Sequence, residues 1–131
     1  MVNITIDDAK AYCDWLTAQD RKHIYRLPSE EEWILGAGHM PKDVAMNSDH
    51  VKSGLTAVDA YNQSTGACGG IDFWGNCWEW TSSTNADGLY IIKGGSWDSK
   101  RDDCRSEKSD DVRMGTQGYA NVGFRVVRTD R

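Results

Sequence analysis

The order of the secondary-structure signals constrains the fold of this chain more than any other feature. Helical patterns are confined to the first 37 residues, and strand-like segments separated by glycine turns follow residue 70. In the first helical pattern Ala9, Tyr12, Cys13 and Leu16 recur at i, i+3, i+4 and i+7, which places them on one core-facing side of a helix. Helices followed by short strands, rather than alternating with them, indicate an α+β domain.

Local signals predict where both helices begin. The alternation of β-branched residues from Asn3 to Ile6 predicts a short strand before the first helix. Asp7 or Asp8 can then cap the first helix, where acidic side chains also favour the helix dipole. Ser29 and Glu32 have the spacing of a capping box, which predicts that a second helix begins after Ser29.

The middle of the chain predicts irregular structure. No sustained period runs through residues 36–70, so we expect a long loop there, and loops of this length are usually functional or stabilised by a ligand. Strand character returns in residues 71–83, 89–93 and 121–129, and the last of these predicts one final strand. Cys77 is expected to replace an aliphatic residue on a buried strand.

Length and charge limit the functions that this chain can have. A chain of 131 residues predicts one domain, 1–131, and the 39% hydrophobic fraction with six tryptophans indicates a folded core. A net charge of −5 provides no basic field for DNA or RNA. No apolar run is long enough for membrane insertion, and the N-terminus has no signal-peptide pattern, so we expect a cytoplasmic or virion-associated protein.

The cysteines and histidines do not form a metal-binding or hydrolytic motif. None of the four cysteines (Cys13, Cys68, Cys77 and Cys104) belongs to a CxxC pair, and the three histidines are scattered in polar segments, which disfavours zinc. We expect reduced and mostly buried thiols. No GxSxG or similar nucleophile motif is present.

Five segments, in this order, resemble the markers of the formylglycine-generating enzyme (sulfatase-modifying factor) family: "NITIDDAKAYCDWL", "YRLPSEEEW", "GIDFWGNCWEWTSS", "IIKGGSWDSKRDDCRSE" and "NVGFRVVR". The resemblance implies a variant C-type lectin fold, with two helices packed on short antiparallel sheets and much irregular loop. It also implies that the family's usual N-terminal portion, before "NITIDDA", is missing. The tryptophans of "CWEW" and "GGSW" are expected to supply much of the core.

The resemblance also allows the family's oxidase chemistry to be tested on the residues. The family's enzyme holds copper with two cysteines after the Gly-Gly-Ser-aromatic turn and oxidises a cysteine of a partner protein. Cys104 matches the second cysteine, but Ser99 stands at the place of the first and Lys100 at that of the following histidine. A serine hydroxyl does not replace a thiolate as a copper ligand. We therefore expect no catalytic residue, with a formylglycine-generating-type oxidase as the alternative. A related branch uses non-haem iron, which requires histidines that no spacing here brings together.

A calcium loop is the one metal site that the resemblance implies. In "GNCWEW" the side chains of Asn76 and Glu79 and the carbonyl of Cys77 would supply hard oxygen ligands. The alternative is that Glu79 only forms hydrogen bonds within a buried turn. Calcium is thus the only cofactor expected, and no cofactor is required.

Because Ser99 replaces the first catalytic cysteine, the resemblance favours the family's non-catalytic members. These include the variable proteins of diversity-generating retroelements. In those proteins a fixed frame displays diversified residues, here about 97–121, to a protein or cell-surface ligand. The frame comprises Gly94, Gly95, Ser96, Trp97, Cys104, Arg105, Ser106 and residues 122–125. The polar residues between these frame positions resemble an adaptable binding surface. The predicted contact residues are Trp97, Asp98, Lys100, Arg101, Glu107, Asp110, Arg113 and Tyr119. A plain solvated loop and an ordinary lectin-like module are the alternatives.

Overall fold

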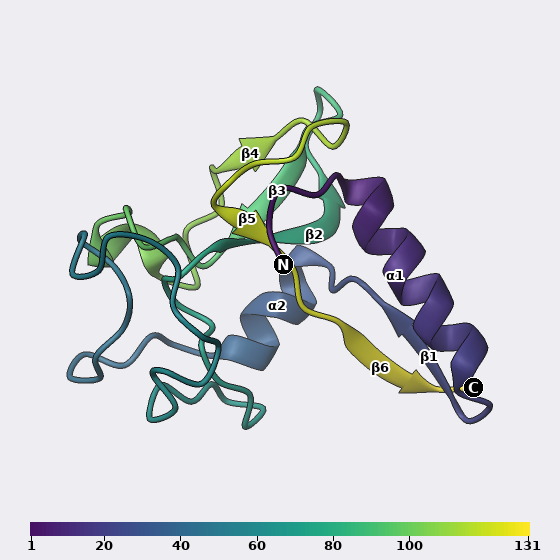
Figure 1. Ribbon diagram of the computed structural model, residues 1–131, viewed down its shortest axis with the longest axis horizontal. Coiled ribbons are helices and arrows are strands. Elements are labelled where there is room, and N and C mark those ends of the chain that lie inside the picture. The colour runs from purple at the N-terminus through teal and green to yellow at the C-terminus, as the bar shows by residue number, and fades with distance from the viewer.

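The computed structural model describes all 131 residues and confirms an α+β arrangement (Figure 1). Two helices come first and most of the strands follow. The elements are α1 (Ile6–Gln19), β1 (His23–Arg26), α2 (Glu30–Ala37), β2 (Trp78–Thr84), β3 (Tyr90–Lys93), the 3-10 turn η1 (Arg101–Cys104), β4 (Val112–Arg113), β5 (Val122–Gly123) and β6 (Val127–Asp130). None of these helices has the length and apolar character needed to cross a bilayer.

The strands form two separate sheets. One has four strands in the order β4-β3-β2-β5, and the other pairs β1 with β6. All pairs are antiparallel except β2 with β5, which is parallel, so the expectation of purely antiparallel sheets is wrong at this edge. The parallel pair arises because the chain passes through β3 and β4 before it returns beside β2.

The expectation of one final strand over residues 121–129 is also wrong. The segment divides into β5, which pairs with β2, and β6, which pairs with β1. Arg125 lies between them and turns its guanidinium inward to Glu79, which interrupts the extended pairing.

The first helix begins earlier than its acidic residues suggested. Thr5 is its N-cap: the Thr5 hydroxyl accepts the Asp8 N–H at 3.1 Å, and the Asp8 carboxylate accepts the Thr5 N–H at 3.0 Å. The predicted strand from Asn3 to Ile6 is absent, because the Asn3 and Ile6 N–H groups bond single carbonyls of a distant loop instead of a ladder. The capping box of Ser29 and Glu32 on α2 is confirmed.

Two apolar clusters form the core. One joins α1 to the four-stranded sheet and includes Trp78 and Trp80, and the other lies under α2 and includes Trp33 and Trp74. These buried indoles confirm much of the expected tryptophan core. Tyr12 was expected to face the core, but it is 41% exposed. It packs edge-on against Phe124, with ring centroids 5.6 Å apart.

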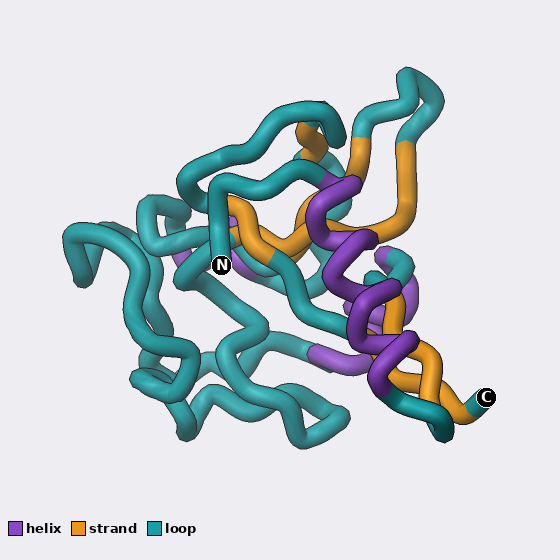
Figure 2. Tube along the Cα trace, turned by 45° about the vertical axis from the view of Figure 1, so that its right-hand side comes forward, coloured by secondary structure: helices purple, strands orange, loops and turns teal.

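A long irregular segment separates α2 from β2, as predicted. Apart from the bridge between Thr65 and Ile71, residues 38–77 contain no helix or strand. Figure 2 shows this segment as loops on the side of the molecule away from α1. Of the four free thiols, Cys13 and Cys104 are buried and Cys77 is half-buried, but Cys68 is exposed, which departs from expectation.

Candidate functional site

A glycine pair after β3 fixes the turn that leads into the candidate surface. Gly94 and Gly95 have φ values of +97° and +71°, which are unfavourable for residues with a Cβ. A Cβ on Gly94 would also collide with the Phe73 carbonyl oxygen, and a Cβ on Gly95 with the Cys104 thiol. The two glycines therefore allow the backbone to pass directly over Cys104.

Cys104 is a buried residue of the frame. It has no exposed surface, and its thiol points to the Lys100 carbonyl oxygen at 3.5 Å. Burial, with smaller contributions from Asp49 and Asp103, raises the pKa of Cys104 to about 12. Such a thiol stays protonated at neutral pH and is a poor nucleophile and metal ligand. The Ser99 hydroxyl already has a hydrogen-bond partner, because it accepts the Ser96 N–H at 3.0 Å.

The long loop supports the candidate surface from one side. The Asp49 N–H donates to the Ser99 carbonyl at 2.7 Å, and the His50 N–H donates to the Trp97 carbonyl at 3.0 Å. The Asp49 carboxylate accepts the Arg101 N–H at 3.1 Å, and the His50 ring meets the Trp97 ring edge-on at 5.3 Å. Trp97 is half-buried in this contact, so its exposure lies between that of a core residue and that of a fully exposed contact residue.

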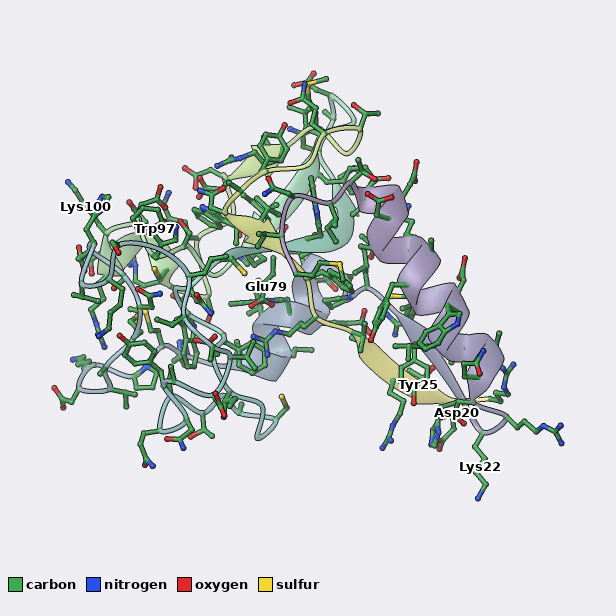
Figure 3. All side chains as sticks on the ribbon, viewed as in Figure 1. Asp20, Lys22, Tyr25, Glu79, Trp97 and Lys100 are labelled. Carbon is green, nitrogen blue, oxygen red and sulfur yellow. The ribbon has the colours of Figure 1, made fainter.

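Three of the predicted contact residues follow Trp97 closely in the chain and differ in exposure. Asp98 and Lys100 are exposed, and Arg101 is half-buried at the start of η1. Figure 3 places Trp97 and Lys100 at the same end of the molecule, far from the tip that carries Asp20 and Lys22. The Ser96 hydroxyl bonds the Asp98 carboxylate, which lowers the pKa of Asp98 and keeps it ionised.

The other four predicted residues lie further along the chain in different contacts. Glu107 bonds His39 at 2.8 Å, and Asp110 bonds Lys108 at 3.0 Å; these bonds lower the pKa of both carboxylates. Arg113 lies on β4, with its guanidinium 5.8 Å from the centre of the Tyr119 ring. Tyr119 packs against the core residue Trp80. Arg113 and Tyr119 thus form a pair beside the sheet.

The residues around Glu79 do not fit the calcium site that the resemblance implies. Glu79 is buried, and the Arg125 guanidinium bonds both of its carboxylate oxygens, at 2.5 and 2.9 Å. The Trp33 indole donates to the same carboxylate at 2.9 Å. A calcium ion here would face the positive charge of Arg125 and displace these bonds. The arrangement matches the alternative of a buried, hydrogen-bonded Glu79.

The other two residues of the implied calcium loop are Asn76, whose side chain is already hydrogen-bonded, and Cys77. The Asn76 side-chain oxygen accepts the Thr56 N–H at 2.9 Å, and its amide donates to Asp72 at 2.9 Å. Burial raises the pKa of Asp72 to about 6. Cys77 precedes β2 and is half-buried, which corrects the expectation of a buried strand position. Nowhere in the chain are three or more His, Cys, Asp or Glu side chains grouped for a metal ion.

The fold and this surface define an α+β domain with long irregular loops, in which Cys104 lies buried beneath the Gly94–Gly95 turn. The family model described as the sulfatase-modifying factor enzyme 1-like domain matches residues 1–130, and the chain belongs to this family. No curated protein sequence matches the chain.

Solved structures share the fold at low sequence identity. PvdO from Pseudomonas aeruginosa aligns with a TM-score of 0.80 and 23% identity over 99% of this chain and 61% of its own. CarF aligns at 0.70 and 18% identity, over 99% of this chain and 67% of CarF. Treponema denticola variable protein 1 aligns at 0.64 and 16% identity, over 96% of this chain and 69% of its own. The chain thus spans about three fifths of the length of PvdO.

Proposed function

We propose that this chain is a non-catalytic ligand-binding module that displays a polar surface, within about residues 97–121, to a protein or cell-surface ligand. The observation that carries the proposal is how the loop over residues 97–101 is held. Its supports include the backbone carbonyls of Trp97, Ser99 and Lys100 and the N–H of Arg101. Every residue type except proline supplies these groups, so the side chain at position 100, which forms no hydrogen bond within the protein, can change while the backbone stays in place. Asp98 and Arg101 add side-chain hydrogen bonds to the Ser96 hydroxyl and to two loop carbonyls.

The absence of oxidase chemistry is part of the proposal. Ser99 supplies no thiolate, and the thiol of Cys104 is buried with a pKa of about 12. The copper site that the resemblance implies uses two soft, deprotonated sulfur ligands, and neither residue provides one in this arrangement. The chain with copper and a thiol-containing peptide should consume no oxygen beyond the rate of free copper. Oxygen uptake with conversion of the peptide cysteine to formylglycine would overturn the proposal and favour the oxidase alternative.

Diversification by a retroelement is the finer part of the proposal. The shared fold with a protein named as a variable protein supports it, together with the division between frame and exposed residues. Arg113 and Tyr119 pack against each other beside the sheet, so we expect diversified positions mainly among the exposed residues around them and around Lys100. The neighbouring DNA is expected to hold a reverse transcriptase and a near-copy of the 3′ coding region that differs at adenines. A genome without them contradicts this part alone.

Ligand binding itself can be tested with a surface variant and a distant control variant. The surface variant combines Asp98→Ala, Lys100→Ala, Arg101→Ala and Glu107→Ala, and the distant control combines Arg21→Ala and Lys22→Ala. A ligand captured from a cell-surface extract by the natural chain should be lost by the surface variant and kept by the control. Both variants should keep a cooperative unfolding transition. Equal capture by the surface variant would contradict the proposed site.

A further inference from the structure

A basic groove lies between the long loop and η1, at the edge of the proposed surface. It has a volume of about 550 Å³ and is open to solvent. Its walls come from two segments that are some sixty residues apart in sequence. The lining residues are His39, Met40, Pro41, Lys42, Arg101, Asp102, Arg105 and Glu107. Only Arg101 and Glu107 were among the predicted contact residues.

The cations of this groove form no salt bridge within the protein. None of the eight salt bridges includes Lys42, Arg101 or Arg105. Elsewhere Arg26, Lys108 and Arg125 are all paired with carboxylates. A chain with a net charge of −5 has more carboxylates than cations, so three unpaired cations in one groove give it a local positive charge.

Arg101 is already held in position for a ligand. One of its terminal nitrogens donates to the carbonyls of Pro41 and Lys42, at 2.8 and 3.0 Å. The other nitrogens of the Arg101 side chain have no hydrogen-bond partner in the protein. The Nε of Arg105 donates to the Asp102 carbonyl at 2.8 Å, and both of its terminal nitrogens are without a partner. Planar guanidinium groups with free N–H pairs match the two oxygens of a carboxylate.

We infer that this groove binds an acidic peptide segment, with Lys42, Arg101 and Arg105 contacting its Asp or Glu carboxylates. This inference rests on the proposed function and names the chemistry of its ligand. Asp102 and the Glu107–His39 pair also face the groove and accept hydrogen bonds, which suits the N–H groups of a peptide. Met40 and Pro41 add apolar contact area.

The probe for this groove is a fluorescein-labelled peptide of alternating Glu and Gly, and the same peptide with Gln for Glu is its neutral control. Fluorescence anisotropy at low and at physiological salt measures their binding to the natural chain, to Lys42→Ala/Arg105→Ala, and to Arg21→Ala/Lys22→Ala. Both double variants remove the same charge. Because each lost contact is charge-assisted, the groove variant should bind the Glu peptide at least about tenfold more weakly. At physiological salt the distant control should remain within about twofold of the natural chain, because Lys22 lies at the opposite end of the molecule from Lys100 (Figure 3) and salt screens charges over such a separation.

Three outcomes would overturn the inference: equal losses in both double variants, equal binding of the Gln peptide, or tighter binding of a sulfated disaccharide than of the Glu peptide. A further variant, Asp102→Asn, removes a negative charge from the groove and should strengthen binding of the Glu peptide. A weakening would contradict the role of the cations. The proposed function is tested separately. If the groove variant still captures the extract ligand and the surface variant does not, the acidic-peptide inference fails and the display surface stands.

Discussion

Replacing Gly95 by alanine should destabilise the protein more than replacement of any glycine that lacks a close neighbour. Two costs add at this position. A residue with a Cβ at φ +71° loses about 1–2 kcal/mol, and the clash of that Cβ with Cys104 adds about 1–3 kcal/mol of overpacking. The sum, about 2–5 kcal/mol, is a large part of the 5–15 kcal/mol that stabilises a typical domain.

The chain contains natural controls that separate the two costs. Gly69 has φ +88°, and no atom lies within 4 Å of the position that an added Cβ would take, so Gly69→Ala should show the backbone cost alone. Gly54 has open space and no positive φ, so Gly54→Ala should change the unfolding free energy little or raise it slightly. Urea unfolding followed by tryptophan fluorescence measures all three. Equal losses for Gly95→Ala and Gly69→Ala would refute the argument that Gly95 makes room for Cys104.

A double-mutant cycle assigns the clash to the thiol. Cys104→Ala alone should cost about 1 kcal/mol, because it leaves a small cavity beneath the turn. Combined with Gly95→Ala, it removes the Sγ atom that the new methyl group meets, so the double variant should lose about 1–2 kcal/mol less than the two single variants together. The Cα and Cβ atoms of Cys104 lie 3.1 Å from that methyl position and keep part of the clash. Strict additivity would mean that the thiol does not fill this space.

Three further predictions concern the buried polar groups. Glu79→Gln should lower the unfolding free energy by about 3–5 kcal/mol, because it leaves the Arg125 charge unpaired, and a loss under about 1 kcal/mol in urea unfolding would contradict the pairing. Millimolar calcium or EDTA should leave the melting temperature unchanged, and a rise with calcium would show that the ion displaces Arg125. Folding raises the pKa of Asp72 to about 6. Between about pH 4 and 6 the unfolded chain has therefore lost the proton of this carboxyl while the folded chain has kept it. This difference lowers the free energy of unfolding as the pH rises through that range. Asp72→Asn should therefore gain up to ~3 kcal/mol over the natural chain across that range, and a difference that is constant with pH would refute the shift.

The parts of the fold that depend on neighbouring residues were predictable from the sequence. The Ser29–Glu32 capping box spans four residues, and it begins α2 where expected. The same logic applied to Thr5 and Asp8 would have found the start of α1, but the β-branched alternation around Thr5 favoured a strand. That alternation had no partner strand, and strands form only where pairing is available.

The parts of the site that depend on distant contacts were not predictable. The residues that hold the Trp97 loop, Asp49 and His50, come from a segment without periodicity, and only its length indicated a role. Tyr119 is near Arg113 in both sequence and space, yet its ring packs on Trp80, about forty residues away. The unpaired state of Lys42 and Arg105 is also invisible in a sequence, since it depends on where every carboxylate lies.

The pairing of Arg125 with Glu79 places a cation of the chain itself where the resemblance implies a calcium loop. Arg125 bonds both oxygens of Glu79 and the backbone carbonyls of Ile71 and Asp72, which are the hard oxygen atoms that calcium prefers. Its guanidinium also lies 3.8 Å from the centre of the Phe73 ring, which shields it from water. Because this cation is covalently part of the chain, no chelator can remove it. Arg125 therefore connects Glu79 of β2 to the Ile71 and Asp72 backbone at any calcium concentration.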